Sequence, residues 1–156
     1  MEFTKNLKEA EEFDKFKSKV LKYVLYKKRT ESEVREKFKS EADEEKLEQV
    51  IEFLIEYNYI NDEEYIERSI AEFKNLKNLS LKEINYKLLS KGVNKKILDN
   101  YIYKNKEELL DFEIMSAKNI FIKKSKTMEL DEIKTYLYKK GYMSESVSIA
   151  YDDLYE

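Results

Sequence analysis

The side chains that could do chemistry in this chain are mainly carboxylates and lysines, because the sequence contains no cysteine, histidine or tryptophan. Zinc sites built on thiolate or imidazole, Cys or His nucleophiles and imidazole general bases are therefore excluded. An enzyme would have to use carboxylates, Lys, Tyr or Ser, yet carboxylates spaced by three or four residues in a helical chain usually form a solvated face. A glycine-rich phosphate loop is also absent, since Gly92 and Gly141 lie 49 positions apart. We predict a binding protein with no catalytic residue, no cofactor and no metal.

Charge is separated by sign along the chain, although the net charge is only −3. Between Glu41 and Glu72 there are twelve acidic residues and two basic ones. Between Lys74 and Lys96 there are seven lysines and one acid. A second lysine-rich stretch runs from residue 118 to residue 140. The pattern predicts one markedly positive face, suited by charge complementarity to an acidic partner.

The candidate partner-binding residues are cations from these stretches and from the first part of the chain. They are Arg35, Lys37, Lys74, Lys77, Lys87, Lys91, Lys95, Lys96, Lys134, Lys139 and Lys140. Lys87 and Lys91 are four positions apart and are expected to share one exposed helix face, with Lys95 and Lys96 at the start of the next helix. The alternative is that these lysines keep the surface soluble and pair with the acids of residues 41–72.

The elements that must position these groups are predicted to be helices, because proline is absent and glycine occurs only twice. Residues 80–101 fit a capped helix, a glycine turn and a second helix. Ser80 and Glu83 form an S-x-x-E capping box, Gly92 stands where only glycine turns left-handed without a Cβ penalty, and Asn94 can cap the next helix. The apolar stripes of the two helices are Leu81, Ile84 and Leu88, then Ile97, Leu98 and Tyr101.

The same pattern occurs once upstream and once downstream. Upstream it comprises the box of Thr30 and Glu33, the cap Asp43, and the apolar positions Val34, Phe38, Leu47, Val50, Ile51 and Leu54. Downstream it comprises Ile133, Leu137 and Gly141, then Ser144 before Val147, Ala150 and Leu154. Equivalent positions, Val34, Ile84 and Ile133, are 50 and 49 residues apart. Fixed self-similarity of this length indicates a repeat protein. We predict an all-α fold of three tandem three-helix repeats stacked into an elongated, curved array.

The spacings set the expected boundaries. Residues 1–14 form an N-terminal leader or stub, and the repeats cover residues 15–57, 58–105 and 106–156. Asn61 and Glu64 suggest a further capping box at the start of the second repeat. Ala42 stands where the other repeats have glycine, so that this turn must end differently or be strained.

Composition is that of a globular protein, with 40% charged and 42% hydrophobic residues. No apolar run approaches the ~18 residues of a membrane-spanning helix, and residues 1–10 lack the apolar core of a signal peptide. We expect a cytoplasmic monomer without a membrane partner.

Several short segments, in this order and at this spacing, resemble the RecX regulators of the recombinase RecA. The resemblance covers residues 13–154. Its segments are Lys22-Tyr23, residues 29–34 (Arg-Thr-Glu-Ser-Glu-Val), residues 56–65 (Glu-Tyr-Asn-Tyr-Ile-Asn-Asp-Glu-Glu-Tyr), Lys82-Glu83-Ile84 with Leu88 and Lys91-Gly92-Val93, and the echo Ile133, Leu137 and Lys140-Gly141-Tyr142.

The resemblance implies a non-enzymatic regulator of DNA repair, recombination and the SOS response. Such a protein binds RecA filaments on single-stranded DNA, lies along the filament groove, and limits strand exchange, ATP turnover and co-protease activity. The chain departs from the family in residues 74–79, which lack the glycine and arginine often present there, and it has only three arginines. Its acidic net charge implies that any direct DNA binding is weak.

Two other functions stay open. Residues 80–101 have the outline of a helix-turn-helix DNA-binding protein, but the second helix offers Asn94, Lys95, Lys96, Asp99 and Asn100 and no arginine for bidentate guanine contacts. A helical scaffold for another protein partner is equally consistent with the periodicity alone.

Overall fold

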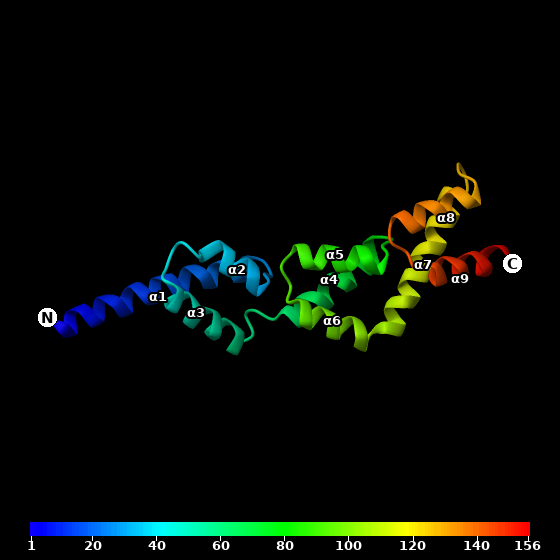
Figure 1. Cartoon of the computed structure of the whole chain (residues 1–156). Coiled ribbons are helices and arrows are strands. Elements are labelled where there is room, and N and C mark those ends of the chain that lie inside the picture. The colour runs from blue at the N-terminus through cyan, green and yellow to red at the C-terminus, as the bar shows by residue number, and fades with distance from the viewer. The chain divides into compact units, whose positions relative to one another are not determined.

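The protein is all-α: the computed structural model describes residues 1–156 and contains nine helices and no strand (Figure 1). This confirms the predicted fold class. The helices are α1 (Glu2–Tyr26), α2 (Glu31–Phe38), α3 (Glu44–Glu56), α4 (Asp62–Leu76), α5 (Leu81–Ser90), α6 (Lys95–Lys104), α7 (Lys106–Lys124), α8 (Leu130–Lys139) and α9 (Ser144–Tyr155). The repeat boundaries and the stacking of repeats into an elongated, curved array stay predictions.

The chain divides into two compact units. Unit 1 comprises Met1–Tyr65 together with the turn Lys91–Asn94, and unit 2 comprises Ile66–Ser90 and Lys95–Glu156.

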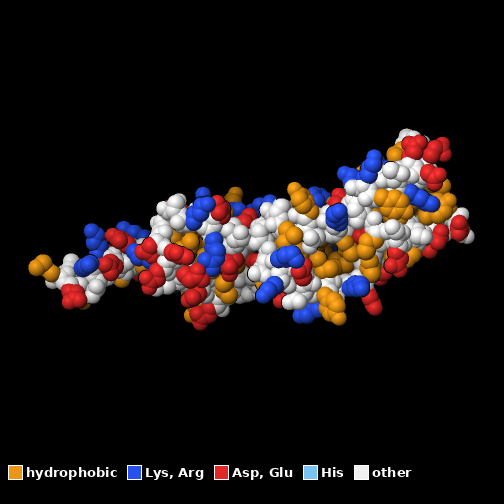
Figure 2. All heavy atoms as spheres, in the orientation of Figure 1, with side chains coloured by type: hydrophobic (Ala, Val, Ile, Leu, Met, Phe, Trp, Pro, Cys, Tyr) orange, Lys and Arg blue, Asp and Glu red, His pale blue; other side chains and the backbone are white.

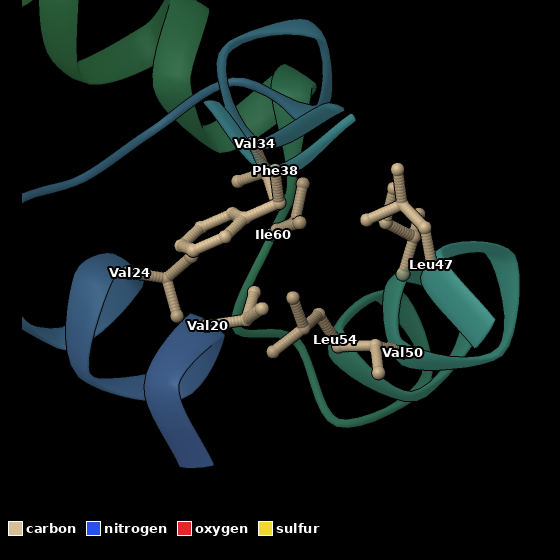
Figure 3. Packing of buried hydrophobic residues seen from close by; sticks show 9 residues of the cluster. Val20, Val24, Val34, Phe38, Leu47, Val50, Leu54 and Ile60 are labelled. Atoms are coloured by element: carbon tan, nitrogen blue, oxygen red, sulfur yellow. The ribbon is translucent and has the colours of Figure 1, made fainter. Parts of the chain in front are cut away.

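Unit 1 is built from α1, α2 and α3, which pack on one another around a single apolar cluster. Phe38 lies at its centre, only 1% exposed, and meets the rings of Phe16 and Tyr23 edge to face. Figure 3 shows Phe38 among Val20, Val24, Val34 and Ile60, with Leu47, Val50 and Leu54 of α3 closing the other side. The apolar stripes predicted for α2 and α3 are therefore the core of this unit.

Residues 1–14, which were expected to form a leader or stub, continue into α1 as one helix without a break. The segment contains neither glycine nor proline, and eight of its fourteen residues (four Glu, two Lys, one Leu and one Ala) favour helix. Residues 1–12 are exposed, whereas Phe13 and Phe16 pack partly against the unit 1 cluster.

Unit 2 has α7 as its central helix, in contact with α5, α6, α8 and α9. Its apolar cluster joins Ala117 and Phe121 of α7 to Ile133 and Leu137 of α8 and to Val147 of α9, all fully buried. Figure 1 shows α7 running beside α8 and α9, while α6 leads into α7 through a sharp bend at Asn105. The stripe predicted downstream of residue 130 is thus also a core.

Four helix starts follow the predicted caps, whereas the start of α9 does not. Thr30 and Glu33 form the complete capping box, as do Ser80 and Glu83. Asp43 accepts a hydrogen bond from the backbone N–H of Lys46, and Asn61 accepts one from the backbone N–H of Glu64. The N-cap of α9 is Met143 with no side-chain cap, so that Ser144 is the first helical residue.

Both glycines lie in left-handed turns, with φ of 83° at Gly92 and 92° at Gly141. Ala42 does not adopt this conformation, because the only non-glycine residue with a positive φ is Asn58, at 61°. The turn after α2 therefore ends without a left-handed residue, as its missing glycine requires. In unit 1 the left-handed residue is instead Asn58, which follows α3; asparagine tolerates this conformation better than most residues.

Replacement of Gly92 by valine is expected to lower the free energy of unfolding by more than ~1 kcal/mol, since a left-handed residue with a side chain costs about 1–2 kcal/mol. A Cβ here would also lie 2.7 Å from Cβ of Ser32. Thermal or urea unfolding followed by circular dichroism measures the loss. Gly92→Ala should fall between wild type and Gly92→Val, and an unchanged midpoint for Gly92→Val would contradict the turn assignment.

Candidate partner-binding surface

In unit 1, a group of hydrogen bonds between side chains and backbone links the start of α2 to the turn at Gly92. We call this group the first joint. Oγ1 of Thr30 donates a hydrogen bond to the carbonyl oxygen of Lys91 at 2.9 Å. The buried carboxylate of Asp62 accepts one hydrogen bond from the backbone N–H of Glu31 at 3.1 Å and another from that of Asn94 at 2.9 Å. One side chain therefore satisfies backbone donors from two segments that lie far apart in sequence.

A second joint of the same design lies in unit 2 and holds the turn at Gly141. Oγ of Ser80 donates to the carbonyl oxygen of Lys140 at 2.7 Å. Glu113, which is fully buried, accepts hydrogen bonds from the backbone N–H groups of Leu81 at 2.7 Å and Met143 at 2.9 Å. The pairs Thr30–Lys91 and Ser80–Lys140 are 61 and 60 positions apart, so that the joint repeats with the sequence pattern. Each glycine turn, with the lysine before it, is consequently fixed from two sides.

The predicted site residues of unit 1 differ in how they are engaged. Arg35 makes a two-pronged contact with Glu48, at 2.8 and 3.1 Å, and a third bond to Glu31. The ammonium of Lys37 lies 5.9 Å from the ring centre of Tyr23. Lys91 is exposed in the turn of the first joint. The guanidinium of Arg35 is thus used within the unit, whereas Lys91 is available.

In unit 2, four of the predicted lysines already have partners. Lys74 pairs with Glu108 and Lys95 with Asp99. Lys134 lies 3.8 Å above the ring of Tyr151, and Lys140 lies 5.7 Å from that of Tyr136. Of these, Lys134 and Lys140 have a ring contact but no ion pair, and the predicted lysines of this unit with neither kind of contact are Lys77, Lys87, Lys96 and Lys139.

The structure corrects one expected arrangement. Lys87 lies within α5, but that helix ends at Ser90, so that Lys91 stands in the following turn and the two lysines do not share a helix face. Instead Lys139 and Lys140 adjoin at the end of α8. Figure 2 shows basic side chains gathered beside α8.

Some acids of residues 41–72 are paired with cations of α1, α2 and the segment between them. Lys19 pairs with Glu41, Lys28 with Glu64 at 3.8 Å, and Arg35 with Glu48. Among the predicted site residues, Arg35 is paired with one of these acids.

The pair of Arg35 and Glu48 shifts the titration of both groups. The hydrogen bonds from Arg35 lower the pKa of Glu48 below its usual 4.5, and the hydrogen bonds to Glu48 raise the pKa of Arg35. Because the folded-state pKa of Glu48 is depressed, the pair stabilises the fold above the ordinary glutamate pKa. That stabilisation is lost as the pH falls through the lowered value.

Replacement of Arg35 by alanine is therefore expected to lower the urea midpoint of unfolding at pH 7. At pH values below the lowered pKa of Glu48, the midpoints of wild type and variant should be nearly equal. Urea titrations of wild type and Arg35→Ala at a series of pH values from 7 downward measure this dependence. Lys39→Ala removes an exposed pair with Glu36 and serves as the control. A midpoint difference that persists unchanged in acid would show that Arg35 acts through packing of its stem instead.

Three functional or positioning side chains were not identified from the sequence. Asp62 and Glu113 are two acids among the many of this chain, and Lys82 lies outside the set of candidate cations. Nothing local in the sequence distinguishes them, apart from the fixed spacing of the segments that they join.

Tyr142 is buried beside the second joint. Its burial, and then the charges of Glu83 and Glu113, raise the pKa of its phenol. The phenol of Tyr142 therefore stays neutral at neutral pH and adds no charge to this turn.

The chain contains no cluster of three or more acidic groups arranged to hold a metal ion. Its longest apolar helical segments are too short or too polar to cross a bilayer.

Comparison with known proteins identifies the family. No protein-family model matches the chain. The regulatory protein RecX of Clostridium beijerinckii is 34% identical over 151 residues, which cover 92% of this chain and 70% of that protein. The chain belongs to the RecX family. A second RecX relative, from Staphylococcus carnosus, is 30% identical over 163 residues, and the chain spans 58% of its length. The sequence resemblance to RecX regulators is confirmed.

The RecX fold is also recognisable in solved structures. The crystal structure of RecX from Lactobacillus salivarius superposes with a TM-score of 0.77 at 23% identity, covering 93% of this chain and 97% of that one. A second crystal structure of a regulatory protein RecX gives a TM-score of 0.79 at 21% identity, covering 96% of this chain and 77% of that one. These likenesses show a shared all-helical fold.

Proposed function

We propose that this protein binds filaments of the recombinase RecA on single-stranded DNA and limits their strand exchange, ATP turnover and co-protease activity. The observation that carries the proposal is membership of the RecX family, whose curated members are named regulatory proteins. The protein is then a cytoplasmic, monomeric and non-enzymatic component of DNA repair, recombination and the SOS response. Any ATP hydrolysis in a mixture belongs to RecA.

The contacts that we propose for the filament are the lysines without a partner inside the molecule. In unit 2 these are Lys77, Lys87, Lys96 and Lys139, and in unit 1 Lys91 is exposed in its turn. Because an ammonium that already has a carboxylate neighbour gains less from a new one, Lys74 and Lys95 are expected to contribute less. Arg35 is assigned to the stability of unit 1.

Co-sedimentation with RecA filaments assembled on single-stranded DNA with nucleotide tests the proposal directly. The protein should pellet with the filament and bind bare single-stranded DNA more weakly. RecA's ATP hydrolysis should fall as the protein is added, and the purified protein alone should hydrolyse no ATP. Equal binding to bare DNA and to the filament would favour a DNA-binding protein instead. Absence of binding to both would favour a scaffold for another partner.

A further inference from the structure

We propose that Lys82, Lys139 and Lys140 form a preformed contact for acidic side chains of a protein partner. We call these residues the turn cluster. The proposal rests on the proposed function, because the partner tested is the RecA filament. It adds Lys82 and places the contact at the second joint, in unit 2.

The turn cluster is brought together by Gly141. A Cβ at this position would lie 2.8 Å from Cδ and 2.9 Å from Cβ of Lys82, so that the Lys82 stem lies directly against the glycine. Lys139 and Lys140 immediately precede that glycine at the end of α8, and all three lysines are exposed. The absence of a side chain at residue 141 is what lets a lysine from the first turn of α5 lie over this turn.

The backbone beneath the turn cluster is held in one geometry. Ser80 donates to the carbonyl oxygen of Lys140, and Glu113 accepts from the backbone N–H of Met143. Within the turn, the N–H of Tyr142 donates to the carbonyl oxygen of Leu137 at 3.0 Å. A contact surface that is ordered before binding loses less conformational entropy when the partner arrives.

No lysine of the turn cluster forms an ion pair within unit 2, and the carboxylates of Glu83 and Glu113, which accept backbone hydrogen bonds near it, keep their own negative charge. Lys82 and Lys139 make no ion pair, and Lys140 contacts only the ring of Tyr136. Glu83 follows Lys82 in sequence, but its carboxylate accepts the hydrogen bond from the N–H of Ser80. Neighbouring like charges repel, so that a preformed group of three lysines is satisfied best by carboxylates from outside.

The corresponding turn of unit 1 has a different composition. There Ser32 lies against Gly92, at 2.7 Å from the position that a Cβ would take. Ser32 and Lys82 are 50 positions apart, the spacing of the repeats. The molecule therefore provides a natural neutral replacement for Lys82, which the experiment uses.

Acidic protein is favoured over single-stranded nucleic acid by the neighbouring aromatic rings. Nucleic-acid surfaces of that kind stack bases on exposed aromatic faces. Here Lys124 lies 4.4 Å from the ring centre of Tyr136, and Lys134 lies 3.8 Å from that of Tyr151. Those two ring faces already carry ammonium groups, whereas the ring of Tyr138, next to Lys139, is 47% exposed, so that binding to bare single-stranded DNA is measured beside binding to the filament.

The decisive variant reverses the charge of the turn cluster, Lys82→Glu with Lys139→Glu and Lys140→Glu. Its affinity for RecA filaments on single-stranded DNA should fall about tenfold or more, with a weaker salt dependence, because rim charges act through long-range attraction. Helical content by circular dichroism should be unchanged. The matched control is Lys104→Glu with Lys106→Glu and Lys126→Glu, three exposed lysines of unit 2 outside the cluster, which should reduce affinity clearly less.

Each result decides a separate point. Wild-type affinity in the turn-cluster variant, or an equal loss in the control, would overturn the turn cluster while leaving filament binding intact. An equal loss of affinity for bare single-stranded DNA would assign the cluster to nucleic acid and overturn the acidic protein partner. Failure of the wild-type protein to bind the filament would overturn the proposed function and this partner with it. If the triple variant does not fold, Lys82→Ser with Lys139→Gln gives the same comparison, with a smaller loss expected.

Discussion

Replacement of Glu113 by alanine is expected to lower the free energy of unfolding by about 2–4 kcal/mol, since each hydrogen-bond donor left without its partner costs about 1–3 kcal/mol. The carboxylate is fully buried and accepts from the backbone N–H groups of Leu81 and Met143. Those donors stand at the starts of α5 and α9, where helix N–H groups have no partner within the helix. Urea unfolding followed by circular dichroism measures the loss.

Two further variants test the reason for that loss. Glu113→Gln should lose roughly half as much, because one amide oxygen can accept one N–H while the amide NH₂ faces the other donor. Glu107→Ala, on an exposed position of the same helix, should change stability by less than about 0.5 kcal/mol. Equal unfolding of Glu113→Ala and Glu107→Ala would show that the second joint contributes nothing to stability.

Replacement of Phe38 by alanine should cost about 3–5 kcal/mol, the usual loss for a buried phenylalanine. The ring is 1% exposed, and its centre lies 5.9 Å from that of Phe16 and 5.4 Å from that of Tyr23. Its removal leaves a cavity where α1 and α2 meet, and stability that is typically about 5–15 kcal/mol in total leaves little reserve. The urea midpoint is the measurement.

A graded series separates the cavity from the loss of any aromatic side chain. Phe38→Leu keeps most of the volume and should lose less than Phe38→Ala. Phe3→Ala removes a ring that is 79% exposed and should be close to neutral. If Phe38→Ala unfolded at the wild-type urea concentration, the unit 1 cluster would not be the core that holds these helices together.

The sequence by itself determined the features that depend on neighbours within about one helical turn. Helical class, the capping boxes at Thr30 and Ser80, and the left-handed turns at Gly92 and Gly141 were all predicted and are all present. Apolar periodicity also identified the buried stripes, because a helix places residues three and four apart on one face. The RecX resemblance rested on the same local segments in order.

Tertiary structure alone decided which charges are engaged and which are exposed without a partner. Glu113 lies 32 positions from Leu81 and 30 from Met143, so that no local pattern could distinguish it from the solvated acids. Arg35 meets Glu48 across 13 positions and is thereby used inside unit 1. Lys82 reaches Gly141 only because packing in unit 2 brings α5 to the turn after α8. A charge is identical in sequence whether or not it has a partner, and only the fold brings that partner within reach.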